Sequence, residues 1–196
     1  HHYHNFHERV PKELHNGPKG IKLAHELAKR IKSETHKKPY DCIIGLSGGV
    51  DSSYVAHLVV NVLKLRPLAI HMDNGWNSEL AVANIENIVK KLKIDLHTEV
   101  LDWEEFRELQ KALFRASVGN VEMATDHAIN ATLFRLTKKF GIRHIISGSN
   151  LNSEGIIQSG GWGHDNKDWI NLCNINRRFG TASLKTYPHL TPLSFA

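Results

Sequence analysis

The chain has 196 residues, a formal net charge of +5 and a hydrophobic fraction of 41%. This length allows one sizeable core but not two ordinary domains, and the composition excludes fibrous and disordered chains. No apolar run approaches the roughly 20 residues that span a bilayer, and no secretory leader is apparent, so we expect no membrane span and a cytoplasmic location. Cys42 and Cys173 form no CxxC pair, which disfavours a disulfide framework.

The basic residues lie in short, scattered clusters rather than in one block. Such scatter favours a small polyanion, such as a nucleotide, over a nucleic acid partner. Histidines at positions 1, 2, 4 and 7 have no neighbouring cysteines, so a solvated tail is preferred over a metal site.

Residues 1–38 are expected to form an irregular lead-in and a helix from Lys19 to about Thr35, which Pro39 stops. Residues 39–196 are expected to form one domain in which strands alternate with helices. The predicted strands cover residues 41–46, 66–72, 95–101 and 143–147. The predicted helices cover residues 53–64, 78–93, 103–116 and a segment after Thr125–Asp126 that ends at Gly141, with no clear element beyond Gly148. This alternation predicts an α/β fold with a doubly wound parallel sheet.

Three polar loops, residues 47–53, 73–78 and 148–154, each follow a predicted strand. Ligands of such sheets bind beyond the carboxyl ends of the strands, where the strand order reverses. We therefore expect the three loops to meet at one site.

The first loop has the composition of a phosphate cradle. Gly48 and Gly49 bring backbone N–H groups close to an anion, serine hydroxyls add donors, and the next helix directs its positive end to the same place. Neither the Walker spacing nor GxGxxG is present. Asp51 would repel phosphate unless a Mg²⁺ ion bridged the two. A glycine turn with an N-capping serine is the alternative, but it explains only one glycine and one serine.

The heptad SGGVDSS, directly after an apolar strand, resembles the signature of the PP-loop (N-type) ATP pyrophosphatases. The resemblance implies a Rossmann-like, adenine nucleotide alpha hydrolase-like fold, with ATP and Mg²⁺ as cofactors and cleavage between the α- and β-phosphates. It implies that this loop holds the pyrophosphate and that Asp51 contacts the metal. The implied cofactor-binding residues here are Leu46, Ser47, Gly48, Gly49, Val50, Asp51, Ser52 and Ser53.

The resemblance also assigns roles to the other two loops. His71 and Met72 are the implied adenine contacts, with Asp73 over the site, although an ordinary Asn-Gly turn fits this loop too. Gly148 and Asn150 are the implied phosphate or ribose contacts. Glu154 is a candidate second Mg²⁺ ligand or substrate contact, and a surface glutamate fits equally well.

Later segments resemble one branch, the N-acetyl sugar amidotransferases of lipopolysaccharide biosynthesis. They are GWNSELA (75–81), IENIVKKLKIDLHTEVLDWEEFR (85–107), FRASV (114–118), DHAI (126–129), SEGI (153–156), WGHD (162–165) and LKTYP (184–188). The resemblance implies that ATP adenylates an acetamido group of a nucleotide-activated sugar and that ammonia from a separate glutaminase subunit displaces AMP. Members usually carry a cysteine-containing segment before the core and continue past LKTYP, so the chain is expected to be trimmed at both ends.

Within these segments Lys185 is the candidate catalytic cation, ahead of Arg115 and Arg135. The candidate substrate contacts are Trp76, Asn77, Asp126, His127, Glu154 and Trp162. Asp126 also fits a helix N-cap and the tryptophans also fit a core. A homo-oligomer is possible. Two other functions stay open, a tRNA-thiolating enzyme and a non-catalytic ATP-binding subunit.

Overall fold

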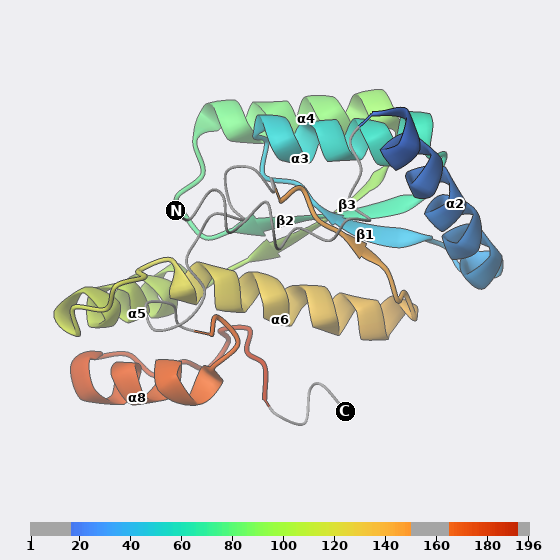
Figure 1. The fold of residues 1–196 in the computed structure, drawn as a ribbon. Coiled ribbons are helices and arrows are strands. Elements are labelled where there is room, and N and C mark those ends of the chain that lie inside the picture. Colours follow the sequence, from blue (N-terminus) through green and yellow to red (C-terminus); the bar gives the residue numbers. More distant parts are fainter. Residues whose placement is uncertain (1–16, 150–164, 192–196) are drawn as a thin grey trace, which may run out of the picture.

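The structure is a computed structural model, and it describes residues 17–149 and 165–191. Helices and strands alternate along most of this part of the chain (Figure 1). In order they are α2 (Pro18–Thr35), β1 (Cys42–Gly45), α3 (Val50–His57), the π-helix η1 (Leu58–Val62), β2 (Pro67–Asp73), α4 (Glu79–Leu92), β3 (Asp95–Val100), α5 (Trp103–Arg115), α6 (Met123–Phe140), β4 (Ile145–Ile146) and α8 (Trp169–Phe179).

The four strands form one parallel sheet in the order β3-β2-β1-β4. Figure 1 shows α3 and α4 on one face of this sheet and α5 and α6 on the other, with α8 packed against α5 as an outer layer. The predicted α/β fold with a doubly wound parallel sheet is confirmed. Strand order runs outward from β1 through β2 to β3, while β4 joins the opposite side of β1, so the reversal lies at β1.

Strand β1 is buried on both faces, which explains why its sequence is a continuous apolar run. On one side Ile43 packs in a cluster with Leu136 of α6. On the other side Ile44 packs with Val59 of η1. Ile31 of α2 joins this second cluster, so α2 shares the core of the sheet.

Three local expectations were wrong. Helix α3 begins at Val50 rather than Ser53, because Gly49 is extended (φ −79°, ψ 168°) and acts as the N-cap. Helix α6 begins at Met123, so Asp126 lies inside its first turn and is not its N-cap. Helix α8 was not expected. Its N-cap is Asp168, whose side chain accepts a hydrogen bond from the backbone of Asn171.

In the described part of the chain, none of the helices has the length and the apolar character that crossing a bilayer requires.

Candidate functional site

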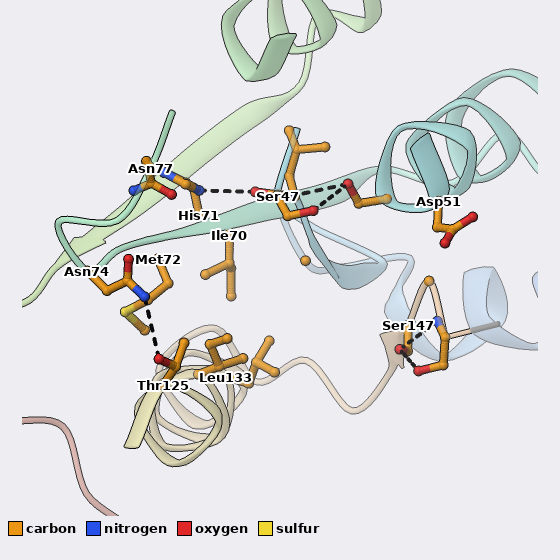
Figure 2. Close-up of a pocket in the computed structure, with 16 residues that line it drawn as sticks. Ser47, Asp51, Ile70, His71, Met72, Asn74, Asn77, Thr125, Leu133 and Ser147 are labelled. Carbon is orange, nitrogen blue, oxygen red and sulfur yellow. Dashed lines mark hydrogen bonds between the residues drawn. The ribbon is translucent and has the colours of Figure 1, made fainter. Parts of the chain in front are cut away.

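A cavity of about 480 Å³ lies at the carboxyl ends of β1, β2 and β4, where the strand order reverses. Figure 2 shows the side chains around it, which come from all three predicted loops and from α6. The lining residues are Gly45, Leu46, Ser47, Asp51, Ser52, Ile70, His71, Met72, Asn74, Asn77, Thr125, Ile129, Leu133, Ser147, Gly148 and Ser149. The expectation that the loops meet at one site is met for their described residues.

One end of the cavity is formed by the first loop and the start of α3. The first-turn N–H groups of α3 have no partner inside the helix, and Asp51 and Ser52 lie in this turn. The Ser52 hydroxyl accepts from the Ser47 N–H at 3.2 Å and donates to the Gly49 carbonyl at 3.1 Å. The Ser53 hydroxyl also donates to that carbonyl, at 2.6 Å. These contacts hold the loop in a tight turn beside the first-turn N–H groups of α3, which suit an anion.

The two glycines of this loop differ in what they require. Gly48 has a φ of +79°, and a Cβ there would lie 2.4 Å from the backbone oxygen of Ala81 in α4. At Gly49 an added Cβ would meet the Ser47 hydroxyl at 3.4 Å, an ordinary contact. Gly48 is therefore glycine because helix α4 lies directly against it.

The third loop also rests on the first. A Cβ at Gly148 would lie 3.4 Å from the backbone carbon of Asp51 and the same distance from the backbone nitrogen of Ser52. This close approach brings Ser147 and Ser149, which share a 2.7 Å hydroxyl contact, to the polar end of the cavity. Asn150, the next residue, lies outside the described part of the chain.

The second loop is shaped by its own side chains. Asp73 accepts from the Gly75 N–H at 3.1 Å and from the Asn77 amide at 3.0 Å. His71, which is buried, contacts the Leu46 carbonyl through Nδ1 at 3.1 Å, and because a carbonyl only accepts, that nitrogen carries the proton. Asp73 thus orders the loop, whereas His71, Asn74 and Asn77 line the cavity.

Helix α6 supplies a wall that the sequence reasoning missed. Thr125, Ile129 and Leu133 recur every four residues, which places them on one helical stripe along the cavity. Figure 2 shows Thr125 and Leu133 of this stripe opposite Ile70 and Met72 of β2. Ile129 is 37% exposed despite its size. The sequence carried no signal for this wall, because Ile129 and Leu133 have the spacing of an ordinary amphipathic helix. The cavity therefore has a polar end and an apolar end.

Several predicted site residues lie away from the cavity lining. Lys185 is exposed, and its backbone N–H donates to the Glu105 carboxylate at 2.9 Å. Trp76 is 67% exposed and forms an edge-to-face pair with Trp103. Arg115 donates to the Phe179 carbonyl and Arg135 pairs with Glu99. Glu154 and Trp162 lie outside the described residues.

Asp126 and His127 are tied to the segment before α8. Asp126 accepts from the Asn166 amide at 2.7 Å, and burial followed by the charge of Glu122 raises the pKa of Asp126. His127 is fully buried. Its Nδ1 lies 2.9 Å from the Asn166 carbonyl, and its Nε2 accepts from the Leu190 N–H at 3.0 Å. Both ring nitrogens are therefore used inside the protein.

We expect His127 to make folding sensitive to acid. Burial, assisted by His189, lowers the pKa of His127, so the unfolded chain takes up a proton before the folded chain does. Stability is then fully present above the ordinary histidine pKa of about 6.5 and falls as the pH drops towards the folded value. His127→Gln keeps a donor and an acceptor without titrating, and should reduce this fall. Urea unfolding at pH 7.5 and 5.5 measures it.

The exposed His25 of α2 provides the matched control, because His25→Gln makes the same substitution at a surface position. This variant should keep the wild-type loss of stability between the two pH values. An equal loss in wild type and His127→Gln would show that His127 does not cause the acid sensitivity.

The oxygen ligands at the polar end of the cavity suit a Mg²⁺ ion that is bound together with a nucleotide, but not one held by protein side chains alone. In residues 17–149 and 165–191, no group of three or more His, Cys, Asp or Glu side chains is placed to hold a metal. Mg²⁺ commonly binds through one or two carboxylates together with substrate phosphates and water. Asp51 offers one carboxylate beside the loop hydroxyls, so the site fits a metal that arrives with a nucleotide.

The chain also resembles known proteins. A family model described as NAD synthase matches residues 23–146. The uncharacterized protein MJ1599 of Methanocaldococcus jannaschii is 30% identical over 139 residues, which cover 69% of this chain and 47% of the relative. This chain therefore spans about half the length of that curated relative.

Solved structures are similar too, among them the following three. The glutamine-dependent NAD+ synthetase from Acinetobacter baumannii in complex with ADP matches 74% of this chain and 28% of its own, with a TM-score of 0.52 and 16% identity. The NH3-dependent NAD synthetase from Campylobacter jejuni in complex with the nitrate ion has a TM-score of 0.48 at 18% identity, with coverage of 66% and 56%. The NMN synthetase from Francisella tularensis has a TM-score of 0.47 at 18% identity, with coverage of 67% and 55%.

The family match runs from α2 through β4 and so covers more than half of the chain, the whole sheet and the first loop. The likeness to the Acinetobacter structure agrees with the parallel sheet and its flanking helices. Together with the SGGVDSS loop at the point where the strand order reverses, these findings show that the chain belongs to the NAD synthase family of PP-loop, ATP-using proteins.

Proposed function

We propose that this chain is the ATP-dependent part of an amidotransferase that converts an acetamido group of a nucleotide-activated sugar into an acetamidino group, in the synthesis of a surface polysaccharide such as the lipopolysaccharide O-antigen. The observation that supports ATP binding is the cavity at the carboxyl ends of the strands, which has one polar end and one apolar end. Its serine and glycine loops suit a polyphosphate, while Ile70, Met72, Ile129 and Leu133 form an apolar wall that suits a purine base.

The proposed reaction has two steps. The acetamido oxygen attacks the α-phosphorus of ATP, the bond to the β-phosphate oxygen breaks, and pyrophosphate leaves. Ammonia then attacks the acetamido carbon, AMP departs with the former amide oxygen, and protons pass to solvent. A separate glutaminase subunit would supply the ammonia.

The residues of this chain would bind and orient the reactants. The first-turn N–H groups of α3 would hold the leaving pyrophosphate, and the apolar wall would fix the base. The Ser52 and Ser53 hydroxyls, which donate to the Gly49 carbonyl, would keep the loop in shape. None of the described lining residues is Lys or Arg. A Mg²⁺ ion on Asp51 would neutralise polyphosphate charge when bound. The catalytic role of Lys185 remains a prediction.

The segments that resemble the sugar amidotransferases contact one another and their neighbours in the structure. Glu105, in the DWEEFR run, accepts backbone hydrogen bonds from residues 185–187 of the LKTYP run at 2.9–3.1 Å. Tyr187 donates from its hydroxyl to the Ala124 carbonyl. His127, in the DHAI run, accepts from Leu190. Runs far apart in sequence therefore form one connected layer around α5 and α6, so a substrate contact in one run would be held by the others.

The family match favours a second candidate, synthesis of NAD, which shares the AMP- and pyrophosphate-forming chemistry. The tRNA-thiolating alternative receives less support, because it needs a reactive thiol. Burial raises the pKa of Cys42 to about 12 and also raises the pKa of Cys173, so neither is a ready thiolate at neutral pH.

Pyrophosphate release from the full chain with Mg-ATP and ammonium, in parallel reactions, separates these functions. We expect release with an acetamido-sugar nucleotide, and ¹⁸O from a labelled acetamido group should appear in AMP. Release with deamidated NAD instead would support NAD synthesis, and release with unmodified tRNA would support thiolation. If the protein binds ATP but releases no pyrophosphate in any of these reactions, the result would support a non-catalytic ATP-binding subunit.

A further inference from the structure

Helix α4 contacts the first loop, residues 47–53, through its backbone and through one side chain. The Ala81 backbone lies against Gly48, and the half-buried Asn84 donates from Nδ2 to the Gly48 carbonyl at 3.1 Å. The start of α4 is itself fixed, because the Ser78 hydroxyl accepts from the Ala81 N–H at 3.2 Å. Asn84 therefore reaches the loop from a rigid support.

The Gly48–Gly49 peptide is the unit that this contact orients. The described part of the chain has no cis peptide bond, and in a trans peptide the C=O and N–H groups point in opposite directions. Holding the Gly48 carbonyl towards Asn84 therefore directs the Gly49 N–H away from α4. The Gly49 N–H donates a long hydrogen bond to the Ser47 hydroxyl, at 3.4 Å, and so points to the side of the loop where Ser47 lines the cavity.

Glycine on both sides makes this peptide plane easy to rotate, because neither residue has a Cβ to restrict it. A rotation would present the Gly48 carbonyl, an acceptor, where an anion needs a donor. An outside hydrogen bond is thus the simplest way to keep the plane in one orientation.

We propose that Asn84 is a positioning residue for anion binding, which holds the Gly48–Gly49 peptide so that the Gly49 N–H faces the polyphosphate of the bound nucleotide. This inference rests on the proposed use of ATP but not on the identity of the substrate that ATP activates. Asn84 acts through the loop and does not touch the ligand itself.

The test compares Asn84→Asp with a matched control, Asn87→Asp, which makes the same charge change at an exposed position of the same helix. An aspartate carboxylate only accepts, so at position 84 it would repel the Gly48 carbonyl and favour rotation of the peptide. Calorimetric titrations with Mg²⁺ would use α,β-methylene-ATP, inorganic pyrophosphate and AMP as separate probes.

In Asn84→Asp we expect affinity for the ATP analogue and pyrophosphate to fall by about 10- to 100-fold, the worth of a hydrogen bond to a charged group. AMP affinity should stay within about twofold, because AMP lacks the pyrophosphate that the loop would hold. Asn87→Asp should match wild type with all three probes. In ¹⁵N spectra of the wild type, pyrophosphate should shift the Gly49 amide signal.

Equal weakening of AMP and the ATP analogue would overturn the positioning role, since it would indicate general damage to the site. Unchanged pyrophosphate affinity in Asn84→Asp would also overturn it. If Asn84→Asp does not fold, the same three affinities are compared in Asn84→Ala. That variant removes the donor without adding charge. These titrations use no sugar nucleotide, so their result does not depend on whether the protein makes an acetamidino sugar. A wild-type protein that binds no nucleotide would overturn both the proposed function and the positioning role of Asn84.

Discussion

Gly48→Ala is expected to destabilise the fold and to abolish nucleotide binding together. At a φ of +79° an alanine costs about 1–2 kcal/mol, and its Cβ would lie 2.4 Å from the Ala81 oxygen, where the backbone of α4 must move. Overpacking of this kind adds about 1–3 kcal/mol. Urea unfolding should therefore show a loss of several kcal/mol, a large part of the stability of a small domain. Titration with α,β-methylene-ATP should show no measurable binding.

Gly49→Ala is the matched comparison, because the neighbouring residue has an ordinary φ and an added Cβ meets the Ser47 hydroxyl at 3.4 Å. We expect this variant to unfold close to the wild-type midpoint. Similar losses of stability at both positions would contradict the explanation of Gly48 by its contact with α4.

Asp51→Asn is expected to remove pyrophosphate release while leaving the fold almost unchanged. The Asp51 side chain is exposed and lines the cavity, so its loss creates no buried defect. An amide is a much weaker Mg²⁺ ligand than a carboxylate, and electrostatic groups at such sites are worth about 10²–10³-fold in rate. The initial rate of pyrophosphate formation should fall by at least about 100-fold, and the Mg²⁺ concentration for half-maximal activity should rise.

Glu79→Gln tests whether charge alone explains this loss. Glu79 also lies in the first turn of a helix and is also exposed, but it does not line the cavity. The variant should retain wild-type activity and the wild-type response to Mg²⁺. Wild-type turnover in Asp51→Asn would remove Asp51 from the mechanism.

The fold was predictable because its central strands are buried on both faces. Cys42, Ile43 and Ile44 form an apolar run that ends in Ser-Gly-Gly, a pattern typical of a parallel strand followed by an anion-binding turn. The position of the cavity followed from topology, since loops after parallel strands share one edge of the sheet. The family match agrees with this part of the reasoning, as it covers α2 through β4.

The parts that were missed depend on contacts between distant segments. Asp126 and His127 were candidate substrate contacts because they lie near a helix start, but their partners, Asn166 and Leu190, are far away in sequence. The Thr125–Ile129–Leu133 stripe reads as an ordinary buried helix face until the sheet is built. Helix α8 has a good N-cap, Asp168, yet it follows a Gly- and Asn-rich stretch that suggested no further element.

Helix α6 faces both the cavity and the core. Its core-facing residues and its cavity-facing residues therefore differ in how much a change of side-chain size would cost the stability of the fold. Leu136 is 2% exposed beneath the sheet, so a smaller side chain there would leave a void. Ile129, two turns earlier and 37% exposed, borders the cavity and can change size at little cost to folding. Ile129 is therefore the natural starting point for altering the selectivity of the apolar wall, which we propose binds the base, while the scaffold is left intact.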